Sequence, residues 1–427
     1  MDTIFAVSSG AAPAAISVLR ISGAGAFAAA RALCGRLPEP RIASLRALRD
    51  PVSGMLLDRG LVLVFPGPNS ATGEDIVELH VHGGRATQRA LEAALGAIEG
   101  LRPAEAGEFT RRALEHGRID LTEAEGLGDL LSAETEHQRR AALRLSEGGL
   151  RQQIEGWNDR LVDVAASIEA ALDFSDEDDV PEAVSAQSGS VLAALSDEIG
   201  TLVAAPSVER LRDGIRVVIA GPPNSGKSTL INRLAGRDVA IVSATAGTTR
   251  DRIEVPVTRS GIAYLLTDTA GLRDEGADEI ERIGIGRAID AIAASDILLW
   301  LDDAPPPYAG AMWLHARCDV PRRTSLPPGR ELAISAASGE GIAALWSALE
   351  ARASALGSSP DEMAINARQR GLLASAEEIL RAGSAEPDIL LRAEAIRSAR
   401  ALFDSITGRA NVEAVLDALF GRFCIGK

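Results

Sequence analysis

Hydrophobic and polar positions near the start of the chain follow two different periods. Short apolar stretches of six residues alternate with longer stretches that repeat every three to four positions, and segments rich in Gly and Pro separate them. The apolar stretches are 16–21, 60–65 and 76–81, and the helical ones are 25–33 and 85–98. This alternation predicts a mixed α/β region over residues 1–117.

From about residue 119 to 172 the pattern changes to long helices. Apolar residues there step by four and three along one helical face. They are Leu150, Ile154, Trp157, Leu161, Val164 and Ile168. A further helix is expected over 185–203, and residues 361–427 return to a helical period.

Between these helical segments, residues 214–350 alternate apolar strands with helices. The strands expected are Ile215–Ala220, Ile297–Leu301 and Leu332–Ile334. Such alternation indicates a largely parallel sheet. One exception is an antiparallel hairpin, with strands over 252–258 and 263–268 around the turn Ser260-Gly261. The pattern favours a domain inserted between two helical segments, with four sequential domains as the alternative.

Composition limits the classes that remain. With 427 residues the chain is long enough for two to four domains, and its apolar content of 46% is ample for their cores. The net charge of −16 argues against a surface coated in nucleic acid, although it leaves room for a local basic patch. Cys34, Cys318 and Cys424 are far apart and odd in number, which favours a reducing compartment. No apolar run approaches about 18 residues, so a cytoplasmic protein without a membrane anchor is expected.

The segment from Gly221 to Ser228 matches the phosphate-binding loop G-x-x-x-x-G-K-[ST], between an apolar strand and a helix. Gly221 and Gly226 allow backbone N–H groups to curl around phosphate at the start of that helix. Lys227 would reach the β- and γ-phosphates, and the hydroxyl of Ser228 would bind Mg²⁺.

Two further motifs lie where a switch GTPase needs them. Asp268-Thr269-Ala270-Gly271 follows the second hairpin strand and matches the DxxG motif. Asp268 would hold Mg²⁺ through water, and the Gly271 amide would sense the γ-phosphate. Thr249, between the two motifs, is the candidate switch threonine that completes the Mg²⁺ site.

Base recognition is the less complete part of the pattern. The position of a guanine-specific NKxD motif is filled by Ala316-Arg317-Cys318-Asp319, which lacks the Asn. Asp319 can still accept from the guanine N–H groups, and Ser335-Ala336-Ala337 fits the loop that backs the base. GTP remains the favoured nucleotide. Leu272 stands where many small GTPases have a water-orienting Gln, so another residue must orient water or hydrolysis is slow.

Over nearly its whole length the chain resembles the MnmE (TrmE) family of tRNA-modification GTPases. The resemblance rests on DTIFAV, SVLRISG, FPGPNSATGEDIVELHVHGG, AGEFTRRALEHGRIDLTEAEGLGDLL, DTAGLR, DEIERIGI and the final FCIGK, besides the nucleotide motifs. It implies a homodimer that joins an FAD-dependent MnmG-type protein in a heterotetramer. Together these proteins add an aminomethyl or carboxymethylaminomethyl group at C5 of the wobble uridine of tRNA. The one-carbon donor is a tetrahydrofolate derivative, in the 5-formyl or methylene form.

The resemblance also implies K⁺-stimulated GTP hydrolysis. The K⁺ ligands carried over are Asn224, Ser243, Thr245 and Thr248, and an oxygen-rich cage of this kind suits a hard cation. Glu281 matches the glutamate that orients the attacking water. Because Asp274–Ala277 is one residue longer than the family form, Glu279 is the alternative, and a solvated helix-face acid is a third reading.

The folate-site residues carried over from the family are Arg20, Glu78, Arg118 and Lys427. Glu78, His80 and His82 share one face of a strand, which leaves a metal site as a weaker alternative to pairing with the pterin. Cys424 has either a chemical role or a packing role.

The expected fold class is therefore a multidomain α/β plus all-α protein. Its parts are an α/β tetrahydrofolate-binding and dimerisation domain (1–117), a discontinuous helical domain (118–210 and 357–427) and an inserted Ras-like P-loop GTPase domain (211–356). The candidate nucleotide-binding residues are Gly221, Asn224, Ser225, Gly226, Lys227, Ser228, Thr229, Ser243, Thr248, Thr249, Asp268, Thr269, Ala270, Gly271, Asp319, Ser335, Ala336 and Ala337.

Two competing hypotheses remain for the function. The first is a ribosome-assembly or signalling switch, and the second is a stand-alone folate enzyme. The folate-like region and FCIGK argue against the first, and the incomplete NKxD motif gives slight support to the second.

Overall fold

The computed structural model describes most of the chain. The described residues are 2–173, 180–205, 214–236, 254–269, 289–356, 363–410, 416, 419–421, 423 and 426. Contacts divide the chain into two compact units. One is Met1–Gly128 together with Asp404–Lys427, and the other is Asp129–Phe403.

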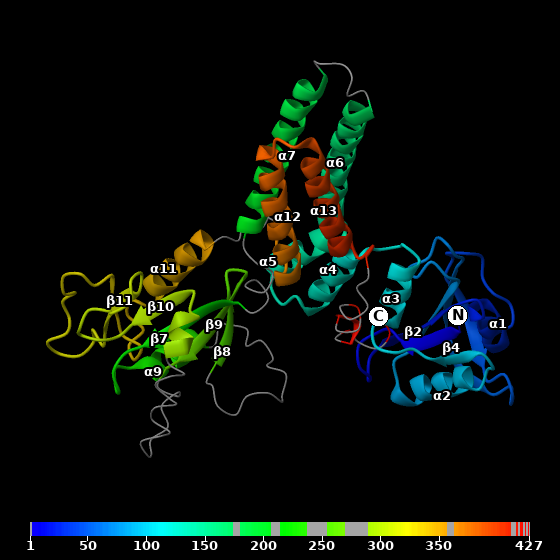
Figure 1. Ribbon diagram of the computed structural model, residues 1–427. Helices are drawn as coiled ribbons and strands as arrows, with labels where there is room; N and C mark the ends of the chain where they lie inside the picture. Colours follow the sequence, from blue (N-terminus) through cyan, green and yellow to red (C-terminus); the bar gives the residue numbers. More distant parts are fainter. Residues whose placement is uncertain are drawn as a thin grey trace, which may run out of the picture. The chain divides into compact units, whose positions relative to one another are not determined.

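The first unit is built on a six-stranded sheet in the order β3-β4-β5-β2-β1-β6, antiparallel except for the β1–β6 pair. The strands are β1 (Thr3–Val7), β2 (Ile16–Ser22), β3 (Ser44–Arg49), β4 (Leu56–Phe65), β5 (Ile76–His82) and β6 (Leu101–Pro103). Helices α1 (Ala26–Cys34) and α2 (Arg85–Gly96) pack on one face of this sheet (Figure 1). The predicted mixed α/β region is confirmed.

The opposite face of this sheet is only partly covered. Phe109 of α3 (Glu108–Glu115) packs on Ile4 and Ala6 of β1. Further along, Leu45 of β3 pairs in register with Leu61 of β4, and both side chains are exposed. Described parts of the chain's end return to this unit, where Phe420 and Phe423 pack on α4 (Leu121–Ser132).

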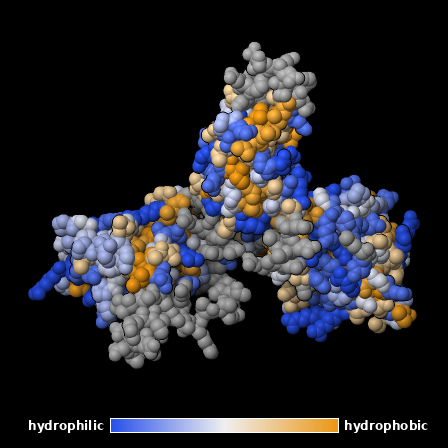
Figure 2. Space-filling view, in the orientation of Figure 1, coloured by the Kyte–Doolittle hydropathy of each residue, from blue (hydrophilic) through white to orange (hydrophobic). Residues whose placement is uncertain are grey.

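Helices from both sides of the inserted segment form one bundle in the second unit. They are α5 (Glu136–Ser146), α6 (Gly149–Asp173), α7 (Val180–Ala204), α12 (Ala367–Ala385) and α13 (Ile389–Thr407, which ends in the first unit). All six residues of the predicted α6 stripe are buried. Figure 2 shows further apolar side chains gathered along the visible face of this helical region.

Contacts between α7 and α12 show the insertion directly. The guanidinium of Arg370 donates to the carbonyl of Ala205 at 2.7 Å, and the hydroxyl of Ser196 donates to the carbonyl of Glu377 at 3.2 Å. The chain therefore leaves the bundle after α7 and re-enters it at α12. The inserted-domain reading is confirmed, whereas the exact boundaries at 117, 210 and 356 stay predictions.

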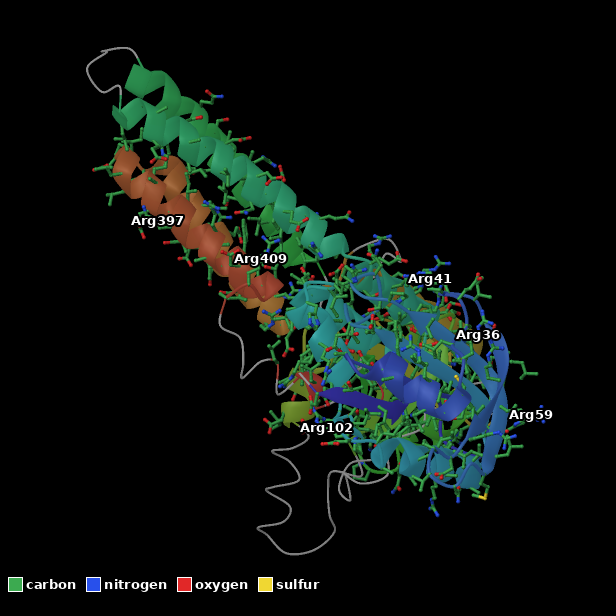
Figure 3. The ribbon with its side chains drawn as sticks, turned by 90° about the vertical axis from the view of Figure 1, so that its right-hand side faces the viewer. Arg36, Arg41, Arg59, Arg102, Arg397 and Arg409 are labelled. Atoms are coloured by element: carbon green, nitrogen blue, oxygen red, sulfur yellow. The ribbon has the colours of Figure 1, made fainter. Side chains whose placement is uncertain are left out.

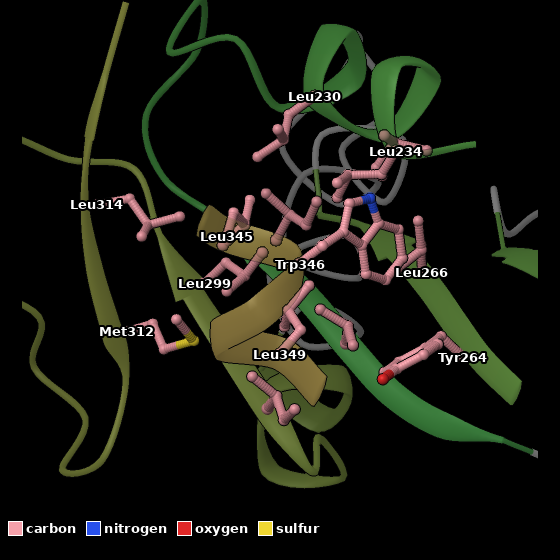
Figure 4. Packing of buried hydrophobic residues seen from close by; sticks show 14 of the residues in the cluster. Leu230, Leu234, Tyr264, Leu266, Leu299, Met312, Leu314, Leu345, Trp346 and Leu349 are labelled. Carbon is pink, nitrogen blue, oxygen red and sulfur yellow. The ribbon is translucent and has the colours of Figure 1, made fainter. Parts of the chain in front are cut away.

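The inserted domain holds a second six-stranded sheet in the order β12-β11-β10-β7-β9-β8, parallel except for the β8–β9 hairpin. Its elements are β7 (Ile215–Ala220), α9 (Lys227–Leu234), β8 (Glu254–Arg259), β9 (Ile262–Asp268), β10 (Ile297–Trp300), β11 (Met312–Ala316), β12 (Leu332–Ile334) and α11 (Ile342–Ala355). Leu299, Leu314 and Leu345 meet in its core with Tyr264 and Trp346, whose rings lie edge to face (Figure 4). The predicted hairpin and parallel strands are confirmed.

Alternation of strands with helices, however, does not hold throughout this domain. Residues 301–311, which join β10 to β11, contain no helix. Three consecutive prolines, Pro305 to Pro307, explain the difference, because proline removes a helical N–H donor and clashes with the preceding turn. No helix in the described part of the chain is long and apolar enough to cross a membrane.

Candidate functional site

The phosphate-binding loop joins the end of β7 to the start of α9. Gly221 and Gly226 have φ values of 153° and 100°, which only glycine adopts without strain. Asn224 also has a positive φ, 61°, and its side chain is exposed. The backbone of the loop therefore has positive φ values at both motif glycines, as the sequence motif led us to expect.

Lys227 holds the loop from inside. Its side chain is buried, and its ammonium group donates to the carbonyls of Gly221 at 3.0 Å and Pro222 at 2.8 Å. The loop is therefore wrapped around a positive charge at the N-terminus of a helix, where the helix dipole adds further positive potential.

Ser228 and Asp268, the two candidate Mg²⁺-site residues within the described part of the chain, are in direct contact. The Ser228 hydroxyl donates to Asp268 Oδ2 at 2.5 Å, and the aspartate is almost fully buried. This contact arises because β7 and β9 are parallel neighbours, with Ile219 opposite Asp268. Thr269 strengthens the junction, since its hydroxyl and its backbone N–H both donate to the carbonyl of Ile219.

One polar atom of the loop has no partner. The hydroxyl of Ser225 is buried and forms no hydrogen bond with the described residues. A buried hydroxyl without a partner costs free energy, so its presence at this position fits a loop built to hold a phosphate group. Ser225, Lys227 and Ser228 together meet the chemical needs of a nucleotide phosphate with its Mg²⁺.

The candidate base-recognition residues follow two neighbouring strands. Ala316 of β11 pairs in register with Ile334 of β12, and the N–H of Cys318 donates to the carbonyl of Ile334 at 3.2 Å. Asp319 is exposed, as a base-binding carboxylate must be. The following loop is tightened by Ser335, whose buried hydroxyl accepts from the N–H of Ser338 at 3.0 Å.

The thiol of Cys318 lies within this base-recognition segment. Its burial, together with the negative charge of Glu340 and a hydrogen bond to it, raises the pKa of the Cys318 thiol. Cys318 therefore stays protonated at neutral pH and serves packing here.

All strands that carry these residues are neighbours in one sheet. Parallel strands present their carboxyl ends at the same edge, where α/β proteins bind ligands. The structure thus brings together Gly221, Asn224, Ser225, Gly226, Lys227, Ser228, Thr229, Asp268, Thr269, Asp319, Ser335, Ala336 and Ala337 at the edge formed by β7 and β9 to β12.

The remaining candidates cannot be placed. Ser243, Thr245, Thr248, Thr249, Ala270, Gly271, Leu272, Glu279, Glu281, Cys424 and Lys427 lie outside the described residues.

A second polar group lies on the sheet of the first unit. Arg20 of β2 and Glu78 of β5 are opposite each other, and the guanidinium donates to Glu78 Oε1 from Nη2 at 2.8 Å and from Nε at 3.1 Å. His80 Nε2 lies 3.2 Å from the other carboxylate oxygen. Burial alone would raise the pKa of Glu78, but the hydrogen bonds and charge of Arg20 outweigh it, so the pKa lies below its usual value.

Phe109 contacts this pair, and Gly426 lies against the neighbouring strand β1. The ring of Phe109 lies 5.7 Å from the Arg20 guanidinium. Gly426 lies so close to β1 that a Cβ there would come within 2.2 Å of the Val7 carbonyl, and Ala6, the residue before Val7, is opposite Arg20. The residue just before Lys427 is therefore near the Arg20–Glu78 pair.

Arg118 has a different neighbour. It lies against Gly73, in the loop that leads into β5, and its side chain is exposed. His82 is bound to Asp58 at 2.8 Å and so does not join Glu78. No group of three or more His, Cys, Asp or Glu residues in the described chain could hold a metal ion.

His80 contacts Glu78, in keeping with the strand face that the sequence predicted for both. One residue of this site was not singled out from sequence. Phe109 comes from a distant helix, and only the packing of α3 on β1 brings it to Arg20.

Comparison with known proteins agrees with this architecture. The family model "GTP-binding protein TrmE N-terminus" matches residues 3–118, and "MnmE helical domain" matches residues 121–424. A protein of Rhizorhabdus wittichii named tRNA modification GTPase MnmE is 54% identical, over 100% of this chain and 97% of its own length. Proteins of the same name from Erythrobacter litoralis and Novosphingobium aromaticivorans are 53% and 50% identical, over 100% of both chains in each case. The chain belongs to the MnmE family of tRNA modification GTPases.

Proposed function

We propose that this protein hydrolyses GTP to drive the modification of wobble uridine in tRNA. The observation that carries the proposal is the contact between Ser228 and Asp268 beside the buried Lys227, within a chain whose full-length relatives are named tRNA modification GTPases. The loop amides and Lys227 bind the phosphates. Ser228 and Thr249 would hold Mg²⁺, which offsets the phosphate charge, and Asp268 would act on it through water.

Potassium is the proposed activator of hydrolysis. Its ligands would be Asn224, Ser243, Thr245 and Thr248. The exposed side chain of Asn224, on a left-handed residue of the phosphate loop, supports the proposal because it is free to bind a cation beside the nucleotide. Glu281 would orient the attacking water, with Glu279 as the alternative.

Turnover of GTP in KCl and in NaCl at equal ionic strength tests this. We expect faster hydrolysis in KCl, and we expect Asn224→Ala to abolish the difference while GTP still binds. Glu281→Ala should slow hydrolysis without weakening binding. Equal slow rates of the wild type in both salts would refute the K⁺ site. Comparable affinity for GTP and ATP would refute the assignment of guanine to Asp319.

A tetrahydrofolate derivative, in the 5-formyl or methylene form, is the proposed one-carbon donor. Arg20, Glu78, Arg118 and Lys427 would bind it. The carboxylate of Glu78 matches a pterin's N–H donors, and its low pKa keeps it an acceptor at neutral pH. The position of Gly426 beside β1 supports a place for Lys427 at this site.

The proposed assembly is a cytoplasmic homodimer that works with an FAD-dependent MnmG-type protein in a heterotetramer. The open face of the N-terminal sheet supports a dimer there. Ile16, Leu45 and Leu61 are between 41% and 63% exposed on β2, β3 and β4, and such apolar surface gains free energy when a second copy covers it.

A further inference from the structure

A run of arginines borders the N-terminal sheet at its β3 edge. We call Arg31, Arg36, Arg41, Arg46, Arg49 and Arg59 the arginine belt. Arg31 lies in the last turn of α1, Arg46 and Arg49 lie in β3, and Arg59 lies in β4. Because β3 is the first strand in the sheet order, the belt follows a free edge of the sheet.

One contact joins two members of the belt, because the guanidinium of Arg46 donates to the carbonyl of Arg36 at 3.2 Å. Arg59 lies opposite Ala47, so its side chain is on the other face of the sheet from that of Arg46. The guanidinium of Arg41 lies 5.5 Å from the ring centre of Phe65, at the end of β4. Figure 3 shows Arg36, Arg41 and Arg59 along one margin of this unit.

The belt carries an excess of positive charge in an acidic protein. Residues 31–59 contain these six arginines and three acidic residues, which are Glu39, Asp50 and Asp58. Asp50 is bound by the N–H and hydroxyl of Ser53, and Asp58 is bound by His82. None of the six arginines forms an ion pair with a carboxylate in the described chain.

Exposed arginines of the helical bundle differ in this respect. Arg139 and Arg140 both pair with Glu136, and Arg397 pairs with Glu394. Their charge is therefore offset locally, whereas the charge of the belt remains available to a ligand.

The chemistry of the belt points to the backbone of an RNA. Arginine forms bidentate, charge-assisted hydrogen bonds with phosphate. Structured RNA is bound largely through its phosphates and 2′-hydroxyls, since its deep major groove excludes side chains. The six residues of β3 span roughly 20 Å, which is long enough to follow several phosphates.

We propose that the arginine belt binds the phosphate backbone of the tRNA substrate. The proposal rests on the proposed function, which supplies tRNA as the substrate.

A pair of triple variants of the full chain tests the belt. The belt variant carries Arg36→Gln, Arg41→Gln and Arg59→Gln. The control carries Arg139→Gln, Arg140→Gln and Arg397→Gln, which remove the same charge from the bundle. The probe is a transcribed tRNA with uridine at the wobble position, titrated at several KCl concentrations.

We expect the belt variant to bind tRNA with an affinity lower by about tenfold or more near 0.1 M salt. The magnitude of its slope of log K against log salt concentration should also fall, by about 2 to 3. The control should match the wild type, and both variants should keep their GTP hydrolysis and circular dichroism.

Unchanged tRNA affinity and slope in the belt variant would overturn the proposal. If that variant instead loses only its flavoprotein partner, the belt is a protein-docking surface. Failure of the wild-type chain to bind tRNA would refute the proposal that tRNA is the substrate. That failure can be told apart from failure of the belt proposal, because it is seen without any variant.

Wild-type protein gives a second measurement that needs no variant to fold. Phenylglyoxal labels accessible arginines, and mass spectrometry locates the labels. Bound tRNA should protect Arg36, Arg41 and Arg59 and leave Arg139, Arg140 and Arg397 reactive. Equal labelling of the belt with and without tRNA would contradict the proposal.

Discussion

Lys227 and Lys427 are the two lysines among the 44 Lys and Arg residues of this sequence; all the others are arginines. Lysine differs from arginine in its compact ammonium with three freely rotating donors. At Lys227 this geometry is used directly, because the ammonium fits inside the loop and reaches two carbonyls. The presence of a second lysine at position 427, in a chain whose other basic residues of this class are arginines, supports a specific role for that ammonium too.

Replacement of the second lysine tests this role. Lys427→Met should weaken binding of 5-formyl-tetrahydrofolate by roughly 10- to 100-fold, the loss of about 1.5–3 kcal/mol expected for a hydrogen bond to a charged group. Isothermal titration calorimetry measures the affinity, and unchanged GTP hydrolysis serves as the control. Full affinity in Lys427→Met would show that this ammonium does not contact the folate.

The low pKa of Glu78 predicts a pH-dependent stability. Because the folded-state pKa lies below its usual value of 4.5, the Arg20–Glu78 pair stabilises the fold at pH values above 4.5. Its contribution is lost as the pH falls through the folded pKa. The difference in unfolding free energy between wild type and Glu78→Gln should therefore shrink from pH 6 towards pH 3. Urea unfolding at several pH values measures it, and a constant difference would contradict the assignment.

Among the elements, α12 shows how local sequence begins a helix. The side chain of Asn366 accepts from the N–H of Gln369 at 2.8 Å, and the Gln369 side chain accepts from the N–H of Asn366 at 3.1 Å. Such a reciprocal cap satisfies two N–H groups that the first turn leaves unpaired. It fixes where the chain re-enters the bundle after the insertion.

Loss of this cap should destabilise the bundle. Asn366→Ala is expected to lower the unfolding free energy by about 1 kcal/mol, measured by urea denaturation. Ser375→Ala is the matched control, since its exposed hydroxyl donates only to the Gly371 carbonyl within the same helix. If both variants lose the same stability, the cap is not the cause.

Periodicity predicted most elements correctly because burial and backbone period are local properties. The α6 stripe and the β8–β9 hairpin followed from it directly. The connection from β10 to β11 did not, since the expected alternation of strand and helix is a rule about folds, whereas Pro305 to Pro307 impose their own conformation.

At the scale of the whole molecule, the contacts between α7 and α12 make the bundle independent of the domain inserted into it. Arg370 and Ser196 connect the two helices on opposite sides of a gap of more than 160 residues in sequence. The ends of the insertion therefore lie close together, which is the arrangement that tolerates excision.

Excision of the inserted domain tests this independence. Replacing residues 206–362 by a short Gly/Ser linker should leave a folded helical protein that still dimerises and binds folate but no longer binds GTP. Far-UV circular dichroism and light scattering measure folding and mass. A molten or aggregated product would show that the bundle needs the inserted domain.

Residue order and short-range periodicity were enough to identify the family, the nucleotide motifs and the types of element, because none of these depends on contacts between distant segments. Which of those residues come into contact became visible only in the folded chain. Ser228 and Asp268 are 40 residues apart, and only the parallel pairing of β7 and β9 brings them into contact. Likewise, four distant segments supply Arg20, Glu78, Phe109 and Gly426. The arginine belt keeps its excess charge because a nearby carboxylate, Asp58, is bound by His82 instead. Contacts of this kind depend on strand order and on packing between distant segments, and neither can be read from a local sequence pattern.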